Sequence, residues 1–142
     1  MIVIDVNILI YAVNEDAPLH GKAKAWIEDT LSGTEIVGFP WTVILAFLRL
    51  TTRQGLFRSP LPVDMAFAVI EDWLGQPPST LLEPGPRHFR LLRDLLESAG
   101  TGGNLTSDAH LAALALESGA CLSTTDGDFA RFPRLRWRNP LA

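Results

Sequence analysis

Four aspartates occupy positions in this sequence from which they could bind a metal ion together. Asp5 directly follows the apolar run that opens the chain, and Asp126 and Asp128 come two and four positions after the predicted strand ACLST. Asp108 lies in the first turn of the helical pattern before that strand. Carboxylates brought close together repel one another and lose hydration unless a cation joins them. Hard oxygen ligands without cysteine or paired histidine favour Mg²⁺ or Mn²⁺.

Each aspartate also has a simpler interpretation when it is taken alone. Asp5 could begin a turn or cap a helix that starts near Asn7. Asp108 could interact favourably with the dipole of its own helix. Asp126 and Asp128 could form a turn around the glycine between them. None of these interpretations explains why all four fall at the same end of the predicted elements, so the site hypothesis is favoured.

Three uncharged polar residues accompany the aspartates. Asn7 could orient Asp5 or a metal-bound water, or it could only cap the helix. Thr124 and Thr125 could form hydrogen bonds within the site, or they could be ordinary residues at the end of a strand. The predicted site therefore includes these three as supporting residues.

The elements that must position these residues alternate along the chain. Apolar runs bounded by turn residues predict strands, and apolar residues at helical spacing predict helices. Strands separated by helices indicate a mostly parallel sheet covered on both faces, which binds ligands at the carboxyl ends of its strands. Strands are expected at 1–4, 35–38, 79–83, 120–124 and 135–137, and helices at 16–33, 40–55, 63–75, 86–100 and 106–119.

Composition limits the class of protein. The chain has 142 residues, of which 47% are hydrophobic and 20% charged, and this predicts one globular domain over 1–142. No apolar run is long enough to span a bilayer, and no basic segment precedes the first run. Cys121 is the only cysteine, so no internal disulfide forms and a cytoplasmic location is expected.

The charge argues against a protein that coats nucleic acid without specificity. The net charge is −4, whereas such a coat has a basic footprint. Ten of the twelve cations are arginines, and seven of these lie in 87–138. Arginine suits bidentate phosphate contacts better than lysine does, although solvated surface charge would give the same pattern. His20, His88 and His110 have no partner at ligand spacing, so they are expected to be structural or exposed.

Three stretches in order carry a resemblance to a known family. IDVNILIYAV, PWTVILAFLRL and LTSDAHLAALALESGACLSTTDGDFARFP resemble the PIN-domain proteins. The likeness is greatest to the VapC-type toxins of prokaryotic toxin–antitoxin modules, in the branch first grouped from mycobacteria. The resemblance covers essentially the whole chain. Its first acid matches Asp5 and its later acids match Asp108 and Asp126, which would hold the metal, with Asp128 close by in support.

The resemblance implies a fold, an activity and partners. The implied fold is a three-layer α/β sandwich in which helices flank a central, mostly parallel sheet. The implied activity is that of an Mg²⁺- or Mn²⁺-dependent endoribonuclease, which cleaves RNA phosphodiester bonds with water. The implied partners are a second copy in a homodimer and a cognate, VapB-like antitoxin whose C-terminal segment blocks the active site.

One position departs from the family pattern. PIN domains commonly carry a glutamate in a stretch like LLEFLR, and here the stretch ILAFLR carries Ala46 instead. The number of metal ions, one or two, is therefore open. Arg49 follows on the same helix face and could reach the substrate, or it could be solvated or paired with an acid. Trp41, Leu45 and Leu48 are expected in the core rather than as RNA-stacking groups.

Two other classes of function remain open. One is a metal-dependent phosphatase or DNA nuclease on a similar scaffold. A haloacid-dehalogenase-like phosphatase would have Asp-x-Asp after the first strand, and Asn7 in the second place counts against it. The other is a catalytically weak binding module that keeps the fold. Ala46 is the best argument for that module, and the retained later acids argue against it.

Overall fold

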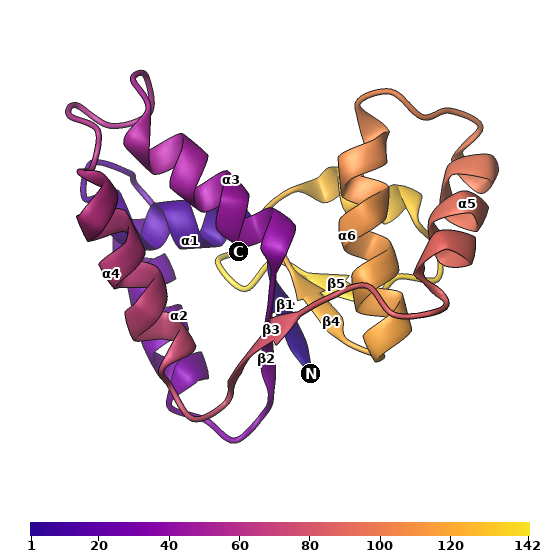
Figure 1. Cartoon of the computed structure of the whole chain (residues 1–142), viewed down its shortest axis with the longest axis horizontal. Coiled ribbons are helices and arrows are strands. Elements are labelled where there is room, and N and C mark those ends of the chain that lie inside the picture. The colour runs from indigo at the N-terminus through magenta and orange to yellow at the C-terminus, as the bar shows by residue number, and fades with distance from the viewer.

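The computed structural model describes residues 1–142 and contains one five-stranded sheet in which every neighbouring pair of strands is parallel. The spatial order is β3-β2-β1-β4-β5, so the first strand lies at the centre (Figure 1). This confirms the predicted parallel sheet. The strands are β1 (Ile2–Ile4), β2 (Val37–Pro40), β3 (Ser79–Leu82), β4 (Cys121–Ser123) and β5 (Trp137–Arg138).

Helices cover the sheet on both sides, which confirms the predicted three-layer arrangement. The helices α1 to α4 gather on one side, and α5 and α6 pack together on the other (Figure 1). The α-helices are α1 (Val6–Val13), α2 (His20–Leu31), α3 (Trp41–Thr52), α4 (Val63–Leu74), α5 (His88–Ala99) and α6 (Leu105–Ser118), and a short 3₁₀ helix η1 (Gly127–Arg131) follows β4.

The hydrophobic core lies around the central strands. All three residues of β1 are buried, as are Phe39 of β2 and Leu122 of β4. Strands with helices on both faces must be apolar on both faces, which explains why these segments read as continuous apolar runs. Full burial of one such side chain stabilises the fold by about 1.5–3 kcal/mol. The core therefore fixes the ends of β1 and β4 side by side.

Several boundaries differ from those expected. The helix expected over 16–33 begins only at His20, because a series of turns follows α1 and places Pro18 before the helix. The second strand is displaced to Val37–Pro40, since its register against β1 buries Val37 and leaves Ile36 exposed. The sequence patterns also did not delimit α1 or predict η1.

The exposure of helix α3 corrects one expectation. Trp41 and Leu45 were expected in the core, yet their exposed fractions are 46% and 59%. Only Leu48 is partly buried against the core. The apolar stripe of α3 is wider than the face that β2 and the neighbouring helices α1 and α4 cover.

None of the helices is both long enough and apolar enough to cross a membrane.

Candidate functional site

The ends of β1 and β4 bring the first and last aspartates together. The two strands are parallel neighbours, with Ile4 opposite Ser123. The backbone N–H of Asp5, directly after β1, donates to the carbonyl of Ser123 at 2.9 Å. The connection from β1 to β2 runs over one face of the sheet through α1 and α2. The connection from β3 to β4 runs over the other face through α5 and α6 (Figure 1). Such a reversal of strand order opens a crevice at the carboxyl ends of the strands, where ligands bind in α/β proteins.

Three donors fix the Asp5 carboxylate. The hydroxyl of Thr124 donates to Oδ2 at 2.7 Å, and the Asn7 side-chain amide donates to the same oxygen at 3.3 Å. The backbone N–H of Val6 donates to Oδ1 at 2.7 Å, so Asp5 is also the N-cap of α1. The capping interpretation and the site interpretation of Asp5 are therefore compatible. The side chain cannot rotate without the loss of these bonds.

Thr124 is the centre of the hydrogen-bond network. Its fully buried hydroxyl donates to Asp5 and accepts from the backbone N–H of Asp126 at 3.0 Å and from the Asn7 amide at 3.2 Å. The carbonyl oxygen of the Asn7 side chain accepts from the backbone N–H of Thr125 at 3.3 Å. One hydroxyl thus links the end of β1, the start of α1 and the loop after β4. The structure brings together all three predicted supporting residues.

The loop after β4 presents Asp126 and Asp128. Asp126 is half-buried and its Oδ1 accepts from the backbone N–H of Asp128 at 2.9 Å, which makes it the N-cap of η1. The Asp128 carboxylate is exposed to solvent. Asp126 thus forms the turn with Asp128 that the sequence suggested. This turn uses only Oδ1, so Oδ2 of Asp126 is available for another ligand.

Asp108 completes the cluster from α6. It lies in the first turn of that helix and is half-buried. Burial raises the pKa of the Asp108 carboxyl, and the negative charges of Asp126, Asp5 and Asp128 raise it further. The charge of Arg131 acts in the opposite direction. Because Asp108 is affected by all three other aspartates, the four side chains predicted to form a site share one electrostatic environment.

Asp5 carries a similar electrostatic cost. Burial is the main cause that raises the pKa of its carboxyl, and the charge of Asp126 adds to it. The hydrogen bonds from Thr124 and from the backbone of Val6 oppose the shift. A buried carboxylate beside other carboxylates gains most from a bound cation.

The donors fit a hard divalent cation in type. Every candidate ligand is a carboxylate oxygen, which suits Mg²⁺ or Mn²⁺. No group of three or more His, Cys, Asp or Glu side chains is close enough to hold a metal ion by direct contacts alone. Mg²⁺ usually keeps several waters and is bound through one or two carboxylates plus substrate phosphate. The cluster fits that mode of binding, with some carboxylates acting through water.

The remaining predicted residues lie on α3. This helix begins directly at the carboxyl end of β2. Ala46 is half-buried, and Arg49 is exposed without a salt bridge. The structure leaves Arg49 free for the substrate contact suggested by the sequence, and that contact remains a prediction. No carboxylate on α3 takes the place of the family glutamate.

The sequence patterns missed Arg131 as a neighbour of the acids. It lies at the end of η1, five positions after Asp126. The short helix turns the chain so that the Arg131 charge acts on Asp108. A signal was present in the sequence, because Asp126 followed by glycine and a second aspartate is typical of a capped helical turn.

Two of the histidines form a pair that their spacing did not reveal. Nε2 of His88 on α5 and Nδ1 of His110 on α6 are 2.9 Å apart. His88 is buried, and burial together with the neighbouring His88 lowers the pKa of His110. The pair links the two helices that cover one face of the sheet, which fits the structural role expected for these residues.

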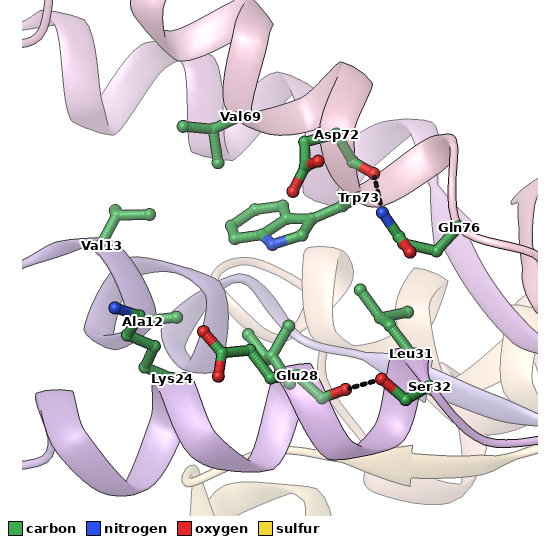
Figure 2. A pocket seen from close by; sticks show the side chains of 11 residues that line it. Ala12, Val13, Lys24, Glu28, Leu31, Ser32, Val69, Asp72, Trp73 and Gln76 are labelled. Atoms are coloured by element: carbon green, nitrogen blue, oxygen red, sulfur yellow. Dashed lines mark hydrogen bonds between the residues drawn. The ribbon is translucent and has the colours of Figure 1, made fainter.

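A separate pocket lies between α2 and α4, away from the aspartates. Its volume is about 320 Å³, and Figure 2 shows the Trp73 ring between the two helices, facing Val13 and Val69. Lys24 and Glu28 line the α2 side. A second pocket shares Ala12, Val13, Lys24 and Val69 with it, so the two form one continuous groove.

Comparisons with known proteins agree on one family. The chain matches the PIN domain over residues 2–135. Ribonuclease VapC37 of Mycobacterium tuberculosis is 45% identical over 142 residues, covering 100% of this chain and 99% of the relative. Ribonuclease VapC33 of the same species is 41% identical over 141 residues, covering 99% of each chain.

Solved structures share the fold. The structure of VapBC2 from Rickettsia felis, bound to a DNA fragment from its promoter, includes a chain that matches with a TM-score of 0.72 and 17% identity, covering 98% of both chains. A chain of VapBC-1 from nontypeable Haemophilus influenzae matches with a TM-score of 0.71 and 17% identity, covering 100% of both. At this identity the likeness concerns the architecture.

Proposed function

This chain belongs to the PIN-domain family, and from that premise we propose that it is a divalent-metal-dependent endoribonuclease, the toxin of a VapBC-like toxin–antitoxin pair in the cytoplasm. The observation that carries the proposal is the shared electrostatic environment of four aspartates at the carboxyl ends of β1 and β4. Such a cluster is costly for folding unless it binds a cation. The names of the relatives support RNA as the substrate.

Each aspartate has a distinct role in this proposal. Asp5, Asp108 and Asp126 hold the ion directly or through water, and Asp128 supports them with its exposed charge. When bound, Mg²⁺ or Mn²⁺ supplies polarisation of the scissile phosphate and lowers the pKa of a bound water. Thr124 keeps the Asp5 carboxylate in one orientation, so the site needs little rearrangement when the ion and the phosphate arrive.

Metal dependence can be tested with the purified full chain and three substrates: single-stranded RNA, single-stranded DNA of the same sequence, and a phosphate monoester. We expect RNA to be cleaved with Mg²⁺ or Mn²⁺. Since metal catalysis is worth several kcal/mol, excess chelator should lower the rate at least about 100-fold. Restored metal should restore the rate.

The other outcomes of this assay separate the remaining functions. Undiminished RNA cleavage in chelator would contradict a metal-dependent site. Preferential cleavage of DNA or of the monoester would instead support a DNA nuclease or a phosphatase. RNA binding without cleavage would support the weak binding module, for which the absence of a carboxylate at Ala46 is the relevant observation.

The groove between α2 and α4 is the surface that we assign to the antitoxin. It has an apolar floor that includes Trp73 and Val69, and charges of both signs at its edges, including Lys24 and Glu28. An amphipathic segment matches that pattern, because its apolar face buries against the floor and its charges pair at the rim. The VapBC names of the solved relatives support a partner of this kind.

A second copy of the chain is the other expected partner. Trp41 and Leu45 lie one turn apart on α3, and Val63 and Phe67 lie one turn apart on α4. All four are largely exposed, and the two helices pack against each other. Aromatic residues exposed in this way are typical of interfaces. We therefore place the homodimer contact on the outer faces of α3 and α4.

One mixing experiment tests both partners. The chain alone should have about twice its mass of 15.6 kDa by light scattering. The product of the neighbouring antitoxin-like gene should bind it through the groove between α2 and α4, and its C-terminal segment, which is expected to block the active site, should stop RNA cleavage. Val69→Glu places a charge in the apolar groove and should weaken that binding about 10- to 100-fold. Ala68→Glu, on the adjacent exposed position, is the matched control. Equal binding by the two variants would contradict the assigned groove.

A further inference from the structure

The arginines of this chain differ in whether they already have a partner. The Arg93 guanidinium is paired with Glu97 at 2.7 Å, and those of Arg87 and Arg136 donate to backbone carbonyls at 3.0 and 2.6 Å. Arg131 and Arg134 are exposed and take part in no salt bridge or side-chain hydrogen bond. These two guanidinium groups are therefore available to bind an anion, whereas Arg87, the N-cap of α5, and Arg93 within α5 are already engaged.

Arg131 and Arg134 lie along one wall of a groove that begins at the end of η1, the short helix that Asp126 caps. The groove has a volume of about 310 Å³. The segment from Arg131 to Arg134 forms one wall, and the C-terminal half of α5 forms the other, with Asp94, Leu95 and Ser98. Arg131 links the groove to the cluster along the chain, because it lines the groove and is the last residue of η1, whose N-cap is Asp126. The groove therefore begins one short helix away from the proposed active site.

The two walls differ in chemistry. The arginine wall offers forked N–H donors, which match the geometry of phosphate oxygens. The α5 wall offers the Asp94 carboxylate and the Ser98 hydroxyl, which can accept from amino groups of bases or from ribose hydroxyls. The negative charge of Asp94 disfavours phosphate on the α5 wall. A single nucleic-acid strand in this groove would therefore be oriented with its phosphates on the arginine side.

We propose that Arg131 and Arg134 bind consecutive phosphates of the RNA strand next to the scissile phosphate, and that the groove between η1 and α5 holds this part of the substrate. The proposal rests on the ribonuclease function proposed above. It solves a problem that this function raises, because an acidic cluster repels RNA in a protein of net charge −4. The two unpaired arginines of this groove supply a local attraction that the protein as a whole lacks.

The test measures RNA affinity and kinetics separately. Affinity for a single-stranded RNA is measured over a range of salt concentrations with the Asp5→Asn chain in Mg²⁺, so that the RNA stays intact. Each phosphate contact with a single strand contributes about −0.7 to the slope of log affinity against log salt. Arg134→Gln should therefore make the slope shallower by about 0.7, and Arg131→Gln with Arg134→Gln by about 1.4.

Kinetics distinguish a binding role from a structural one. In the otherwise unchanged chain, Arg134→Gln should raise KM roughly 3- to 10-fold and leave kcat within about a factor of two. Arg134→Lys keeps the charge and should retain most of the salt slope. Lys22→Gln removes the same unit charge from the exposed surface of α2, on the other side of the sheet, and should change neither KM nor the slope.

The outcomes separate this inference from the proposed function. Wild-type salt slope and KM in both arginine variants would overturn the groove assignment while the ribonuclease function stands. Equal effects of Lys22→Gln and Arg134→Gln would also overturn it, because the effect would then be one of net charge. A chain that binds RNA through these arginines without cleaving it would overturn only the function. A chain that binds no RNA would overturn both.

Discussion

The Asp5→Asn variant should cleave RNA at least about 100-fold more slowly than the wild type while its fold is unchanged. The substitution removes one negative charge from the buried end of the cluster, and charge count is a main determinant of affinity for a hard divalent cation. Loss of a few kcal/mol of transition-state stabilisation corresponds to a loss of this size. The measurement is the rate of RNA cleavage at saturating Mg²⁺, with circular dichroism as the check of the fold.

The fold should survive because asparagine caps helices as well as aspartate does. Its side-chain oxygen can still accept from the backbone N–H of Val6. Asp29→Asn is the matched control, since Asp29 is exposed on α2 and lies outside the cluster. That control should cleave RNA at the wild-type rate. Wild-type activity in Asp5→Asn would remove Asp5 from the proposed mechanism.

The second large effect concerns stability. Asp108→Asn should raise the midpoint of thermal unfolding at pH 7 without metal, although the same change should strongly reduce cleavage. The folded-state pKa of Asp108 is raised, so the folded chain is relatively favoured when this carboxyl is protonated. That contribution is fully present below the unfolded pKa of about 3.9 and is lost as pH rises through the folded value. Asparagine is neutral at every pH, so the variant does not lose this stability as the pH rises.

The pH and metal dependence identify the cause of this gain. The stabilisation by Asp108→Asn should disappear at pH 3, where the wild-type carboxyl is protonated. Mg²⁺ should stabilise the wild type more than the variant, since an ion that binds only the folded state shifts the unfolding equilibrium. Asp64→Asn is the control, because Asp64 also lies in the first turn of a helix, α4, and is exposed. A similar change in both variants would contradict repulsion within the cluster as the cause.

Asp108 is the better residue for this measurement than Asp5. The Asp5 carboxylate accepts hydrogen bonds from Thr124, Asn7 and the backbone of Val6, so replacement breaks bonds as well as removing charge. The two effects on stability have opposite signs. The Asp108 side chain has no such hydrogen-bond partners in the chain. The pKa of its carboxyl is raised by burial and by neighbouring charges, without a contribution from hydrogen bonds.

The sequence predicted the aspartate cluster because position on a strand is a strong signal. Asp5 and Asp126 each follow an apolar run, and parallel strands place their carboxyl ends at one edge of the sheet. The fold class and the central sheet followed from the same alternation of strands and helices. Strand order did not follow, because periodicity does not tell which strands are neighbours.

The network around Thr124 was only partly predictable. Its position at the end of a strand suggested a role in the site, but a hydroxyl that contacts Asp5, Asn7 and Asp126 at once depends on the pairing of β1 with β4. The position of Arg131 near the acids depends in the same way on η1. That helix is too short to give a clear periodic pattern in the sequence. Local patterns identify which residues carry chemistry, whereas tertiary packing decides which of them meet.

The exposed face of α3 shows a different limit. Apolar residues at helical spacing predicted burial of Trp41 and Leu45, and the isolated chain leaves both exposed. Apolar residues at helical spacing can face the core of the chain, or they can form a surface that another molecule covers. A rule that assigns all apolar positions to the core therefore fails on a helix face, such as that of Trp41 and Leu45, that no other part of the chain covers.

The bond between Thr124 and Asp5 joins residues that are 119 positions apart. Two of the four aspartates, Asp126 and Asp128, also follow Asp5 by more than a hundred positions. The order of synthesis then matters, because a growing chain contains Asp5 long before it contains the hydroxyl that orients it. A ribosome-bound fragment that ends before Thr124 lacks that hydroxyl and half of the cluster. The four aspartates can therefore come together only after Asp128 has been synthesised.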